Sequence, residues 1–463
     1  MSGFSPDHRY PLSGRSSVTV VGAGVSGRSL AVLARELGYP VFVTETREID
    51  DGARAIFKKN GISFESGGHS QRMLECDTMV LSSGVSPNAD PVVLALKNGI
   101  PIVGELDFVG PHLKGSIIGV TGSNGKTTTT MLAGHLFKKA GFKAGVAGNV
   151  GSPLAEHAGI DHEVIVAELS SFQLFWAKRF RLDLAVITNI EPDHIDWHGS
   201  LEEYFRSKKK ILEMLPQNGR VICQFRDLPM LFPSGDVENK AIPLVWGSRK
   251  ENRGNKGILM DEDQAVLADG GAGIKLFEYG DLPLLGRHNL ENAAMSITSL
   301  SLLGGNMRSV KSSLASFKAP SHRCELVAVI DGVTYIDDSK GTNVAATVTA
   351  LSSLEGKKIV ILGGKGKGED YGPLAIAVSR EAAGVVLIGE EKPRIREALI
   401  KEGFWAFKEA LTMKEAVETA IEMSKMGDVV LLSPACTSWD MYANYKERGD
   451  DFRRSVEAAS GEQ

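Results

Sequence analysis

One glycine-rich loop in this chain has the residue types and spacing of a phosphate-binding site. It reads Ile117-Ile118-Gly119-Val120-Thr121-Gly122-Ser123-Asn124-Gly125-Lys126-Thr127-Thr128, and a helical pattern follows from Thr129 to Lys139. Glycines let backbone N–H groups turn toward phosphate oxygens. The helix N-terminus adds a favourable dipole, Lys126 a point charge and the Thr127 hydroxyl a ligand for Mg²⁺. The sequence therefore predicts that residues Gly122 to Thr128 bind a nucleoside triphosphate.

The spacing of this loop is shorter than that of the general phosphate-loop motif G-x-x-x-x-G-K-[ST]. Val120 stands five residues before Gly125, where that motif has glycine, so the match is to the form T-G-x-x-G-K-T. A simple turn before an ordinary helix would explain Gly122 and Gly125, but it would not explain the Lys-Thr-Thr that follows.

A second glycine loop, Gly22-Ala23-Gly24-Val25-Ser26-Gly27, also follows a predicted strand and opens a helical pattern. With Glu45 near the end of the next strand it matches a dinucleotide fingerprint, which favours NAD or FAD. The glycines are equally compatible with the pyrophosphate of a sugar-nucleotide substrate. A third interpretation is tight packing of helix on strand without any ligand.

Acidic and imidazole side chains follow two further predicted strands. Glu168 ends an apolar strand, where its carboxylate could hold Mg²⁺ beside a triphosphate or be a solvated strand-end acid. His194 and His198 permit a zinc interpretation, but no third soft ligand is nearby. A histidine close to Mg²⁺ and the phosphates is the interpretation that we favour for this segment.

Lys208 lies at a position where helical periodicity calls for an apolar residue. Leu201, Tyr204, Lys208, Ile211 and Leu215 share one helix face. The amine either reaches solvent along that face or is partly buried near the catalytic centre, where burial would lower its pKa.

Amides and cations near further strand ends could face the triphosphate. Asn289 and Asn292, three residues apart, could contact an adenine or ribose or cap a helix. Several cations in the third domain could neutralise the charge that develops in phosphoryl transfer. They lie in the segments His322-Arg323, Asp338-Ser339-Lys340, Lys365-Gly366-Lys367 and Ser433 to Tyr445.

Alternating strands and helices place these residues in three successive α/β domains. We expect a Rossmann-like N-terminal domain over residues 1–104, a central P-loop ATPase-like domain with a parallel sheet over 105–317, and a Rossmann-like C-terminal domain over 318–463. The expected strands are 17–24, 41–44, 78–81, the apolar run that begins at Ile117 before the phosphate loop, 164–167, 184–187, 333–336, 358–362, 384–388 and 428–432, with hairpins or a mobile insertion at 253–275.

Bulk composition narrows the class of protein. The chain has 463 residues, 43% of them hydrophobic and 24% charged, with a formal net charge of -5, so nucleic acid is not an expected partner. The four cysteines are scattered, as in a reduced protein, and residues 1–14 lack the apolar segment of a signal peptide. We expect a cytoplasmic protein without membrane insertion.

Taken together, these motifs resemble those of the Mur ligases, ATP-dependent amide-forming enzymes of peptidoglycan precursor synthesis. The resemblance covers nearly the whole chain and is weak at about 222–277. Within the family, Ser433 to Asp440 and Tyr445 to Gly449 resemble the branch that adds D-glutamate, although phenylalanine is usual where this chain has Tyr445. The matching motifs are residues 121–128, 148–151, 168–173, 189–194, 286–292, 322–323 and 338–343.

The resemblance implies ligands and roles for individual residues. The ligands would be ATP, Mg²⁺, UDP-N-acetylmuramoyl-L-alanine and D-glutamate, and the protein would be a monomer. The UDP-substrate would contact Ser26, Gly27, Thr46, Arg47, Ser83, Gly84, Asn149 and His194. ATP would contact Gly122 to Thr128, Asn289, Asn292, Arg323 and Asp338. Metal ions would be held by Thr127, Glu168, His194 and Lys208, the last as its carbamate. D-Glutamate would contact Thr342, Lys367, Ser438 and Tyr445, and the catalytic residues would be Lys126, Glu168, His194, Lys208 and Lys340.

The implied reaction proceeds through an acyl phosphate, which the amine of the incoming amino acid attacks. The rival interpretations are a sister ligase that adds another amino acid, a folylpolyglutamate synthase, a dinucleotide-dependent oxidoreductase and a nucleotide-binding switch without ligase chemistry.

Overall fold

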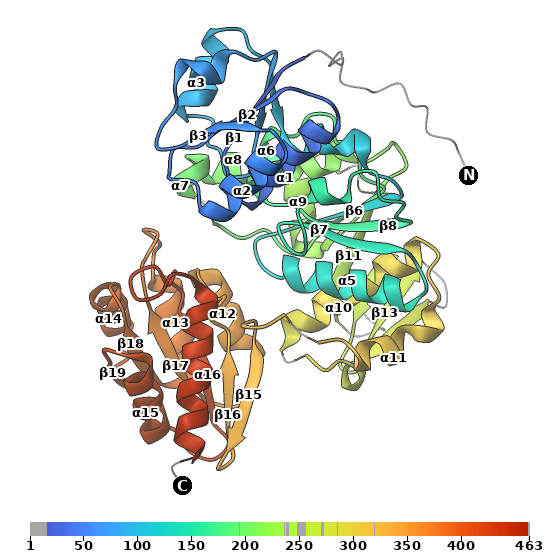
Figure 1. Ribbon diagram of the computed structural model, residues 1–463. Helices are drawn as coiled ribbons and strands as arrows, with labels where there is room; N and C mark the ends of the chain where they lie inside the picture. The colour runs from blue at the N-terminus through green and yellow to red at the C-terminus, as the bar shows by residue number, and fades with distance from the viewer. Residues whose placement is uncertain are drawn as a thin grey trace. The chain divides into compact units, whose positions relative to one another are not determined.

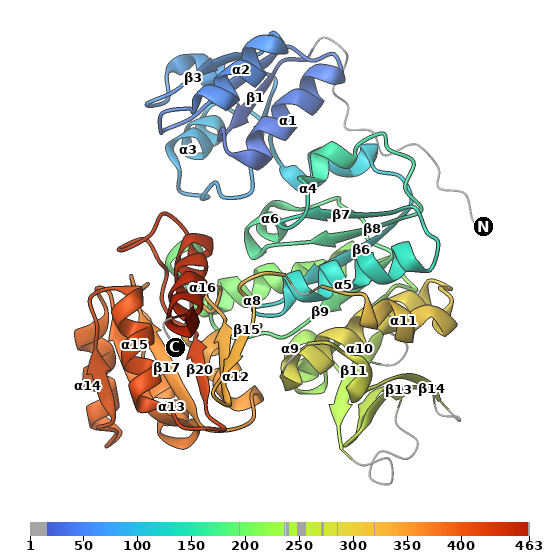
Figure 2. The same ribbon diagram turned by 60° about the horizontal axis from the view of Figure 1, so that its bottom comes forward.

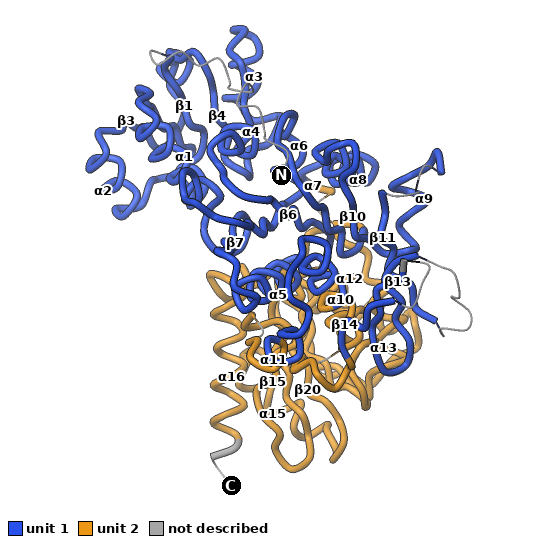
Figure 3. Tube along the Cα trace, turned by 90° about the vertical axis from the view of Figure 1, so that its right-hand side faces the viewer, with its two compact units in different colours: residues 1–190, 197–277, 294–313 blue, residues 191–196, 278–293, 314–463 orange. Residues whose placement is uncertain are grey.

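The computed structural model describes residues 16–193, 195–235, 237, 240–247, 256–269, 273–284, 286–318 and 320–461. Across these residues, three β-sheets follow one another along the chain (Figure 1). The chain divides into two compact units (Figure 3). Unit 1 comprises residues 1–190, 197–277 and 294–313, and unit 2 comprises residues 191–196, 278–293 and 314–463.

The first sheet has the strand order β3-β2-β1-β4-β5, with parallel pairing throughout. All four residues of β1, β2 and β4 are buried, as expected for strands covered on both faces. The strands expected at 41–44 and 78–81 are confirmed with these bounds. The elements are β1 (Val18–Val21), α1 (Val25–Glu36), β2 (Val41–Thr44), α2 (Asp51–Lys59), β3 (Ser63–Glu65), β4 (Thr78–Leu81), α3 (Asp90–Lys97), β5 (Ile102–Gly104) and α4 (Glu105–Val109).

The second sheet has the order β14-β13-β12-β11-β10-β9-β6-β8-β7. All neighbouring strands between β12 and β7 in this sheet order pair in parallel. Helix α5 packs on β7 and β8 (Figure 2). The strands are β6 (Ser116–Thr121), β7 (Ala144–Gly148), β8 (Val164–Glu168), β9 (Leu184–Ile187), β10 (Arg220–Gln224), β11 (Ala241–Trp246), β12 (Lys256–Met260), β13 (Gln264–Asp269) and β14 (Ile274–Glu278). The helices are α5 (Lys126–Lys139), α6 (Ser171–Trp176), α7 (Ile195–His198), α8 (Leu201–Lys209), α9 (Leu228–Leu231), α10 (Arg287–Leu302) and α11 (Val310–Ala315).

Two expectations for this region can be compared with the structure. Strands β12 and β13 pair antiparallel, which confirms a hairpin within 253–275, although residues 253–255 and 270–272 lie outside the described residues. The α-helix that carries Lys208 is shorter than its apolar periodicity predicts. It ends at Lys209 and continues as a 3₁₀ turn over Lys210–Met214, because Pro216 forces Leu215 into an extended conformation.

The third sheet, in unit 2, has the order β15-β16-β20-β17-β18-β19. Strand β15 pairs antiparallel with β16, and the other pairs are parallel. An α/β fold with three parallel-rich sheets is therefore confirmed, while the boundaries at 104 and 317 remain predictions. The elements are β15 (Glu325–Ile330), β16 (Val333–Asp337), α12 (Val344–Ser353), β17 (Lys358–Gly363), α13 (Gly372–Glu381), β18 (Ala382–Ile388), α14 (Lys392–Lys401), β19 (Phe407–Glu409), α15 (Met413–Met423), β20 (Val429–Leu432) and α16 (Tyr445–Gly461).

In the described part of the chain, no helix combines the length and the apolar character that crossing a membrane would require. All four cysteines, which are Cys76, Cys223, Cys324 and Cys436, are free.

The first glycine loop gives a matched test of close packing. A Cβ added at Gly27 would lie 1.9 Å from the backbone oxygen of Gly22, whereas one added at Gly24 would meet no atom within 4 Å. We expect Gly27→Ala to lower the free energy of unfolding by about 1–3 kcal/mol and Gly24→Ala to leave it nearly unchanged. Urea unfolding monitored by circular dichroism measures both values. Equal stability of the two variants would show that the close approach is not required.

Candidate active site

The loop between β6 and α5 can be built only with glycine at its two key positions. Gly122 has φ of +147° and Gly125 has φ of +79°, a region that other residues rarely adopt. A Cβ on Gly122 would also lie 1.9 Å from the Thr188 hydroxyl oxygen. Because Gly125 is the N-cap, α5 begins at Lys126, three residues before the expected helix start at Thr129.

Two residues that follow β9 hold this loop in place. The backbone N–H groups of Ser123 and Asn124 donate to the Asn189 carbonyl and side-chain oxygens, both at 2.9 Å. The Thr188 hydroxyl donates to the carbonyl of Asn124. Sequence reasoning did not assign a role to Thr188 or Asn189, although Asn189 begins one of the motifs on which the resemblance rests.

Two lysine side chains meet at one carbonyl oxygen of the loop. Lys126 Nζ donates to the carbonyls of Gly122 at 2.7 Å and Ser123 at 2.8 Å, and Lys208 Nζ donates to the same Gly122 oxygen at 2.6 Å. Lys208 is 2% exposed and lies 4.7 Å from the centre of the Tyr204 ring. The Tyr204 hydroxyl is in turn 2.8 Å from Ser123 Oγ. Lys208 therefore faces the loop, and the interpretation in which it reaches solvent is wrong.

Glu168 is buried beside the first turn of α5 and is not a solvated acid. Its side chain accepts hydrogen bonds from the Thr127 hydroxyl at 2.8 Å and from Asn149 Nδ2 at 3.1 Å. Adjacent oxygen ligands of Mg²⁺, each about 2.1 Å from the ion, lie roughly 3 Å apart. The Thr127 and Glu168 oxygens have this separation, so the hard donors and the spacing of this pair fit Mg²⁺.

The two histidines that suggested zinc have different outcomes. His194 lies outside the described residues. His198 is buried, with Nε2 at 2.9 Å from Ser171 Oγ and Nδ1 at 3.4 Å from Ser207 Oγ. Because both ring nitrogens of His198 face hydroxyl groups, this residue does not support the zinc interpretation.

The glycine loop of the first sheet is closed by its own acidic residue. Glu45 accepts hydrogen bonds from the backbone N–H groups of Ala23 at 2.8 Å and Arg47 at 3.1 Å. A dinucleotide site would direct such a carboxylate to a ribose. Ser26 Oγ is buried and has no hydrogen-bond partner among the described residues. Thr46 and Arg47, which follow β2, are exposed.

The loop after β4 carries the remaining residues that were predicted in the first sheet. The carbonyl of Gly84 accepts a hydrogen bond from Trp197 Nε1 at 3.3 Å, and Ser83 is partly exposed.

In unit 2, Asp338 is a buried carboxyl directly after β16. It accepts hydrogen bonds from Ser433 Oγ at 2.7 Å and from the Cys324 N–H at 3.2 Å. Burial raises the pKa of Asp338 to about 7, and the hydrogen bond from Ser433 and the charge of Arg323 only partly oppose this.

Helix α16 and the loop after β16 are held together by a buried arginine. Arg448 is 1% exposed and donates to Ser339 Oγ at 3.0 Å, to the Ser339 carbonyl at 2.8 Å and to the Cys436 carbonyl at 3.1 Å. The Ser339 hydroxyl donates to the carbonyl of Tyr445, the first residue of α16. Lys340 Nζ lies 4.3 Å from the centre of the Tyr445 ring, a contact that phenylalanine would also provide.

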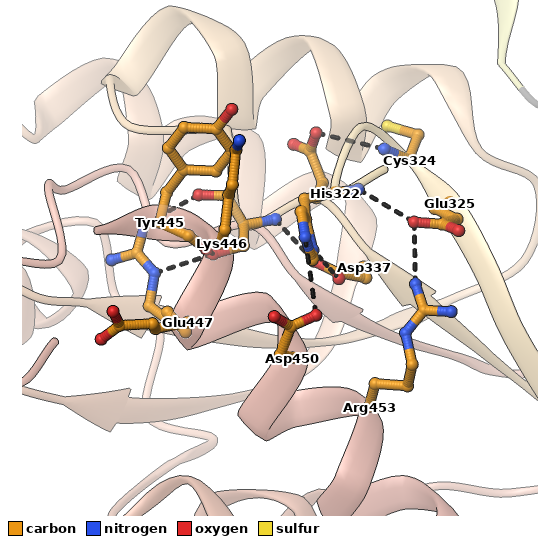
Figure 4. Close-up of polar contacts among 12 residues, drawn as sticks. His322, Cys324, Glu325, Asp337, Tyr445, Lys446, Glu447, Asp450 and Arg453 are labelled. Carbon is orange, nitrogen blue, oxygen red and sulfur yellow. Dashed lines mark hydrogen bonds and ion pairs between the residues drawn. The ribbon is translucent and has the colours of Figure 1, made fainter. Parts of the chain in front are cut away.

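His322 and two acidic residues, Glu325 and Asp337, lie next to this helix (Figure 4). His322 Nδ1 is 2.7 Å from Asp337 Oδ2, and this hydrogen bond raises the pKa of His322. Among the described residues, His322, Glu325 and Asp337 form the one group of three histidine, cysteine or carboxylate side chains whose spacing could hold a metal ion. Glu325, however, accepts from the His322 N–H and pairs with Arg453, both at 2.9 Å. These pairings compete with a cation, so we assign no metal to the group.

The remaining predicted residues of unit 2 are placed as follows. Asn343 Nδ2 donates to Asp193 at 3.2 Å, and Lys367 Nζ lies 3.8 Å from the same carboxylate. Asn292 donates to Asn289 at 3.1 Å within α10. Ser438 is buried and accepts backbone hydrogen bonds from Met441 and Tyr442, while Thr342 is partly exposed and its N–H donates to the carbonyl of Lys340. Asp193 is a contact that sequence reasoning missed, because it depends on segments far apart in the chain.

Comparison with known proteins places the chain among peptide-forming ligases. Family models match residues 17–91 (MurD N-terminal domain), 120–300 (Mur ligase middle domain) and 322–436 (Mur ligase, glutamate ligase domain). The chain is 36% identical over 443 residues to the UDP-N-acetylmuramoylalanine–D-glutamate ligase of Bacteroides fragilis, covering 95% of this chain and 99% of that protein. It is 37% identical over 448 residues to the enzyme of the same name from Pelotomaculum thermopropionicum, covering 96% and 97%.

Solved structures support the fold. The chain resembles UDP-N-acetylmuramate–alanine ligase of Thermotoga maritima with a TM-score of 0.60 and 21% identity, covering 97% of this chain and 100% of that one. It resembles a pseudomurein peptide ligase of Methanothermus fervidus with a TM-score of 0.61 and 19% identity, covering 96% and 100%. The chain belongs to the Mur ligase family, whose fold has three α/β domains.

The raised pKa of Asp338 predicts a pH dependence of stability. Below about pH 4 the carboxyl is protonated in both the folded and the unfolded chain, whereas between pH 4 and 7 the folded chain binds more protons. The contribution of this residue to the free energy of unfolding therefore falls as pH rises through that range. We expect the stability of the native protein relative to Asp338→Asn to decrease from pH 5 to pH 7 in urea unfolding. A difference that stays constant with pH would contradict this assignment.

Proposed function

We propose that this protein adds D-glutamate to UDP-N-acetylmuramoyl-L-alanine at the expense of ATP, in peptidoglycan precursor synthesis. The observation that carries this proposal is the convergence of Lys126, Thr127, Glu168 and Lys208 on one glycine loop. The relatives with 36 and 37% identity over nearly the whole chain bear the name of this D-glutamate ligase, which supports the choice of amino acid. We further propose that the protein acts as a cytoplasmic monomer, without nucleic acid and without membrane insertion.

The phosphates of ATP would bind at Gly122 to Thr128. The Lys126 ammonium beside the Gly122 carbonyl and the N-terminus of α5 suit a polyanion. Thr127 and Glu168 would hold Mg²⁺, with His194 and a carbamylated Lys208 as further ligands. When bound, the ion would neutralise charge on the phosphates.

The other proposed contacts follow the loops already described. The UDP-substrate would lie at Ser26, Gly27, Thr46, Arg47, Ser83, Gly84, Asn149 and His194. Asn289, Asn292, Arg323, Asp338 and Lys340 would contact the nucleotide or the transferring phosphate. Thr342, Lys367, Ser438 and Tyr445 would form the D-glutamate pocket.

The reaction would proceed in two steps at these groups. The alanyl carboxylate attacks the γ-phosphorus of ATP, the bond to ADP breaks and an acyl phosphate forms. The amine of D-glutamate then attacks the acyl carbon, inorganic phosphate leaves and the amine loses a proton. Lys126 and Lys340 would neutralise the phosphoryl oxygens, so the contribution of the protein is positioning and charge stabilisation.

A substrate comparison tests the proposed reaction. Purified protein with ATP, Mg²⁺ and UDP-N-acetylmuramoyl-L-alanine is offered D-glutamate, L-glutamate or meso-diaminopimelate, and phosphate release is measured. We expect release to depend on D-glutamate alone. Release that is indifferent to D-glutamate would contradict the proposed substrate, and tight binding of NADH without binding of ATP would contradict the class of enzyme.

The proposed carbamate of Lys208 is tested by its loss. Carbamylation would convert an amine that donates to Gly122 into an anionic oxygen ligand. We expect Lys208→Ala to lower kcat/KM by at least about a hundredfold, and we expect added bicarbonate not to restore it. The adjacent, partly exposed Lys209 is the matched control, and Lys209→Ala should keep nearly full activity. Full activity of Lys208→Ala would remove the carbamate from the account.

A further inference from the structure

A chain of side-chain hydrogen bonds crosses the carboxyl ends of β2 and β3 in the first sheet. The Thr44 hydroxyl donates to Glu65 Oε1 at 2.7 Å and is also 2.6 Å from His69 Nδ1. On the other side of the imidazole, Nε2 is 2.8 Å from the hydroxyl of Thr46. His69 therefore links a buried threonine of β2 to an exposed threonine that follows the same strand.

The carboxylate at one end of this chain sets the direction of its protons. Burial acts to raise the pKa of Glu65, but hydrogen bonds from Ser70 and Thr44 outweigh it and the pKa is lowered. An ionised Glu65 can only accept hydrogen bonds, so the Thr44 hydroxyl donates its proton to Glu65. The Thr44 oxygen must then accept a hydrogen bond from Nδ1–H of His69. In the neutral ring Nε2 is then an acceptor, and the Thr46 hydroxyl donates to it. The oxygen of Thr46 keeps a lone pair that can accept a hydrogen bond from a ligand.

The backbone just before His69 is hydrogen-bonded to the segment that follows β2. The N–H groups of Gly67 and Gly68 donate to the carbonyls of Arg47 and Glu45, both at 3.3 Å, and Glu45 and Gly68 form an antiparallel bridge. His69 is only partly exposed, between this bridge and the first 3₁₀ turn after β3. The His69 imidazole therefore contacts Thr46 from a segment whose main chain is held by these hydrogen bonds.

We propose that His69 is a positioning residue for the UDP end of the substrate, which fixes the Thr46 hydroxyl as an acceptor for a hydrogen-bond donor of the uridine. The inference rests on the proposed function, in which Thr46 and Arg47 contact UDP. The donors that uridine offers are its imide N–H and its ribose hydroxyls. His69 itself does not touch the nucleotide in this account.

The experiment is a double-mutant cycle on the full-length protein at one fixed pH. His69→Asn keeps a donor for Thr44 but is too short to reach Thr46, and Thr46→Val removes the hydroxyl. Binding of UDP is measured by calorimetry, and kcat and KM are measured for all three substrates. We expect each single variant to weaken UDP binding and raise the KM for the UDP-substrate by about tenfold, as for the loss of one hydrogen bond.

The double variant should bind UDP no more weakly than either single variant, because the two substitutions remove the same contact. The values of kcat and the KM for ATP should stay unchanged, which a general loss of structure would not allow. Gln71→Ala, at an exposed position two residues along, is the matched control and should bind UDP as the native protein does.

Two outcomes would overturn the inference while leaving the proposed function intact. One is unchanged UDP binding in His69→Asn, and the other is an additive loss in the double variant. Failure of the proposed function is distinct, because the native protein would then show no phosphate release dependent on D-glutamate.

Discussion

Two ammonium groups that donate to a single carbonyl oxygen form the interaction on which the second sheet's site depends. Lys126 comes from the first turn of α5 and Lys208 from the last turn of α8, and both reach the oxygen of Gly122. Like charges held this close repel each other strongly when one of them is buried. In the proposed function, carbamylation of Lys208 would remove one of these charges, and the phosphates of ATP would offset the other. The glycine conformation and the Asn189 contacts can be understood as the support that keeps this carbonyl in place.

The two glycine loops of unit 1 show how similar backbones acquire different chemistry. Each follows a central parallel strand, and each uses glycine for a close approach of main chain or side chain. In the loop that ends at Gly27, the N–H of Ala23 donates to a carboxylate, Glu45. The loop that ends at Gly125 has lysines instead. A dinucleotide fingerprint alone therefore could not identify the ligand, since the neighbouring charges decide it.

Much of the fold could be predicted from sequence because buried parallel strands have a strong local signal. Strands β2, β4 and β9 have the expected bounds, each with four consecutive buried residues. Lys208 could be singled out because it interrupts an apolar helix face. Its burial at 2% exposure then distinguished between two interpretations that periodicity had left open. The end of its helix was misjudged, since the effect of Pro216 on Leu215 is local and competes with the apolar pattern.

Contacts between distant segments could not be predicted in the same way. Arg448 is a charged residue in a polar helix pattern, and only the structure reveals its burial against Ser339 and Cys436. His69 carries no motif, and its position between two threonine hydroxyls depends on the pairing of β2 with β3. Spacing within one segment reports helix faces and strand ends, whereas these contacts depend on how the strands are ordered in the sheet.

The central claim is that the charged loop transfers a phosphoryl group from ATP to a carboxylate before the amide bond forms. Its most direct test uses UDP-N-acetylmuramoyl-L-alanine labelled with ¹⁸O in the alanyl carboxylate, with mass analysis of the inorganic phosphate released. The account predicts that each phosphate carries one oxygen from the carboxylate, because the acyl phosphate breaks at the acyl carbon when the amine attacks. Release of phosphate without label, alongside formation of the amide, would contradict it.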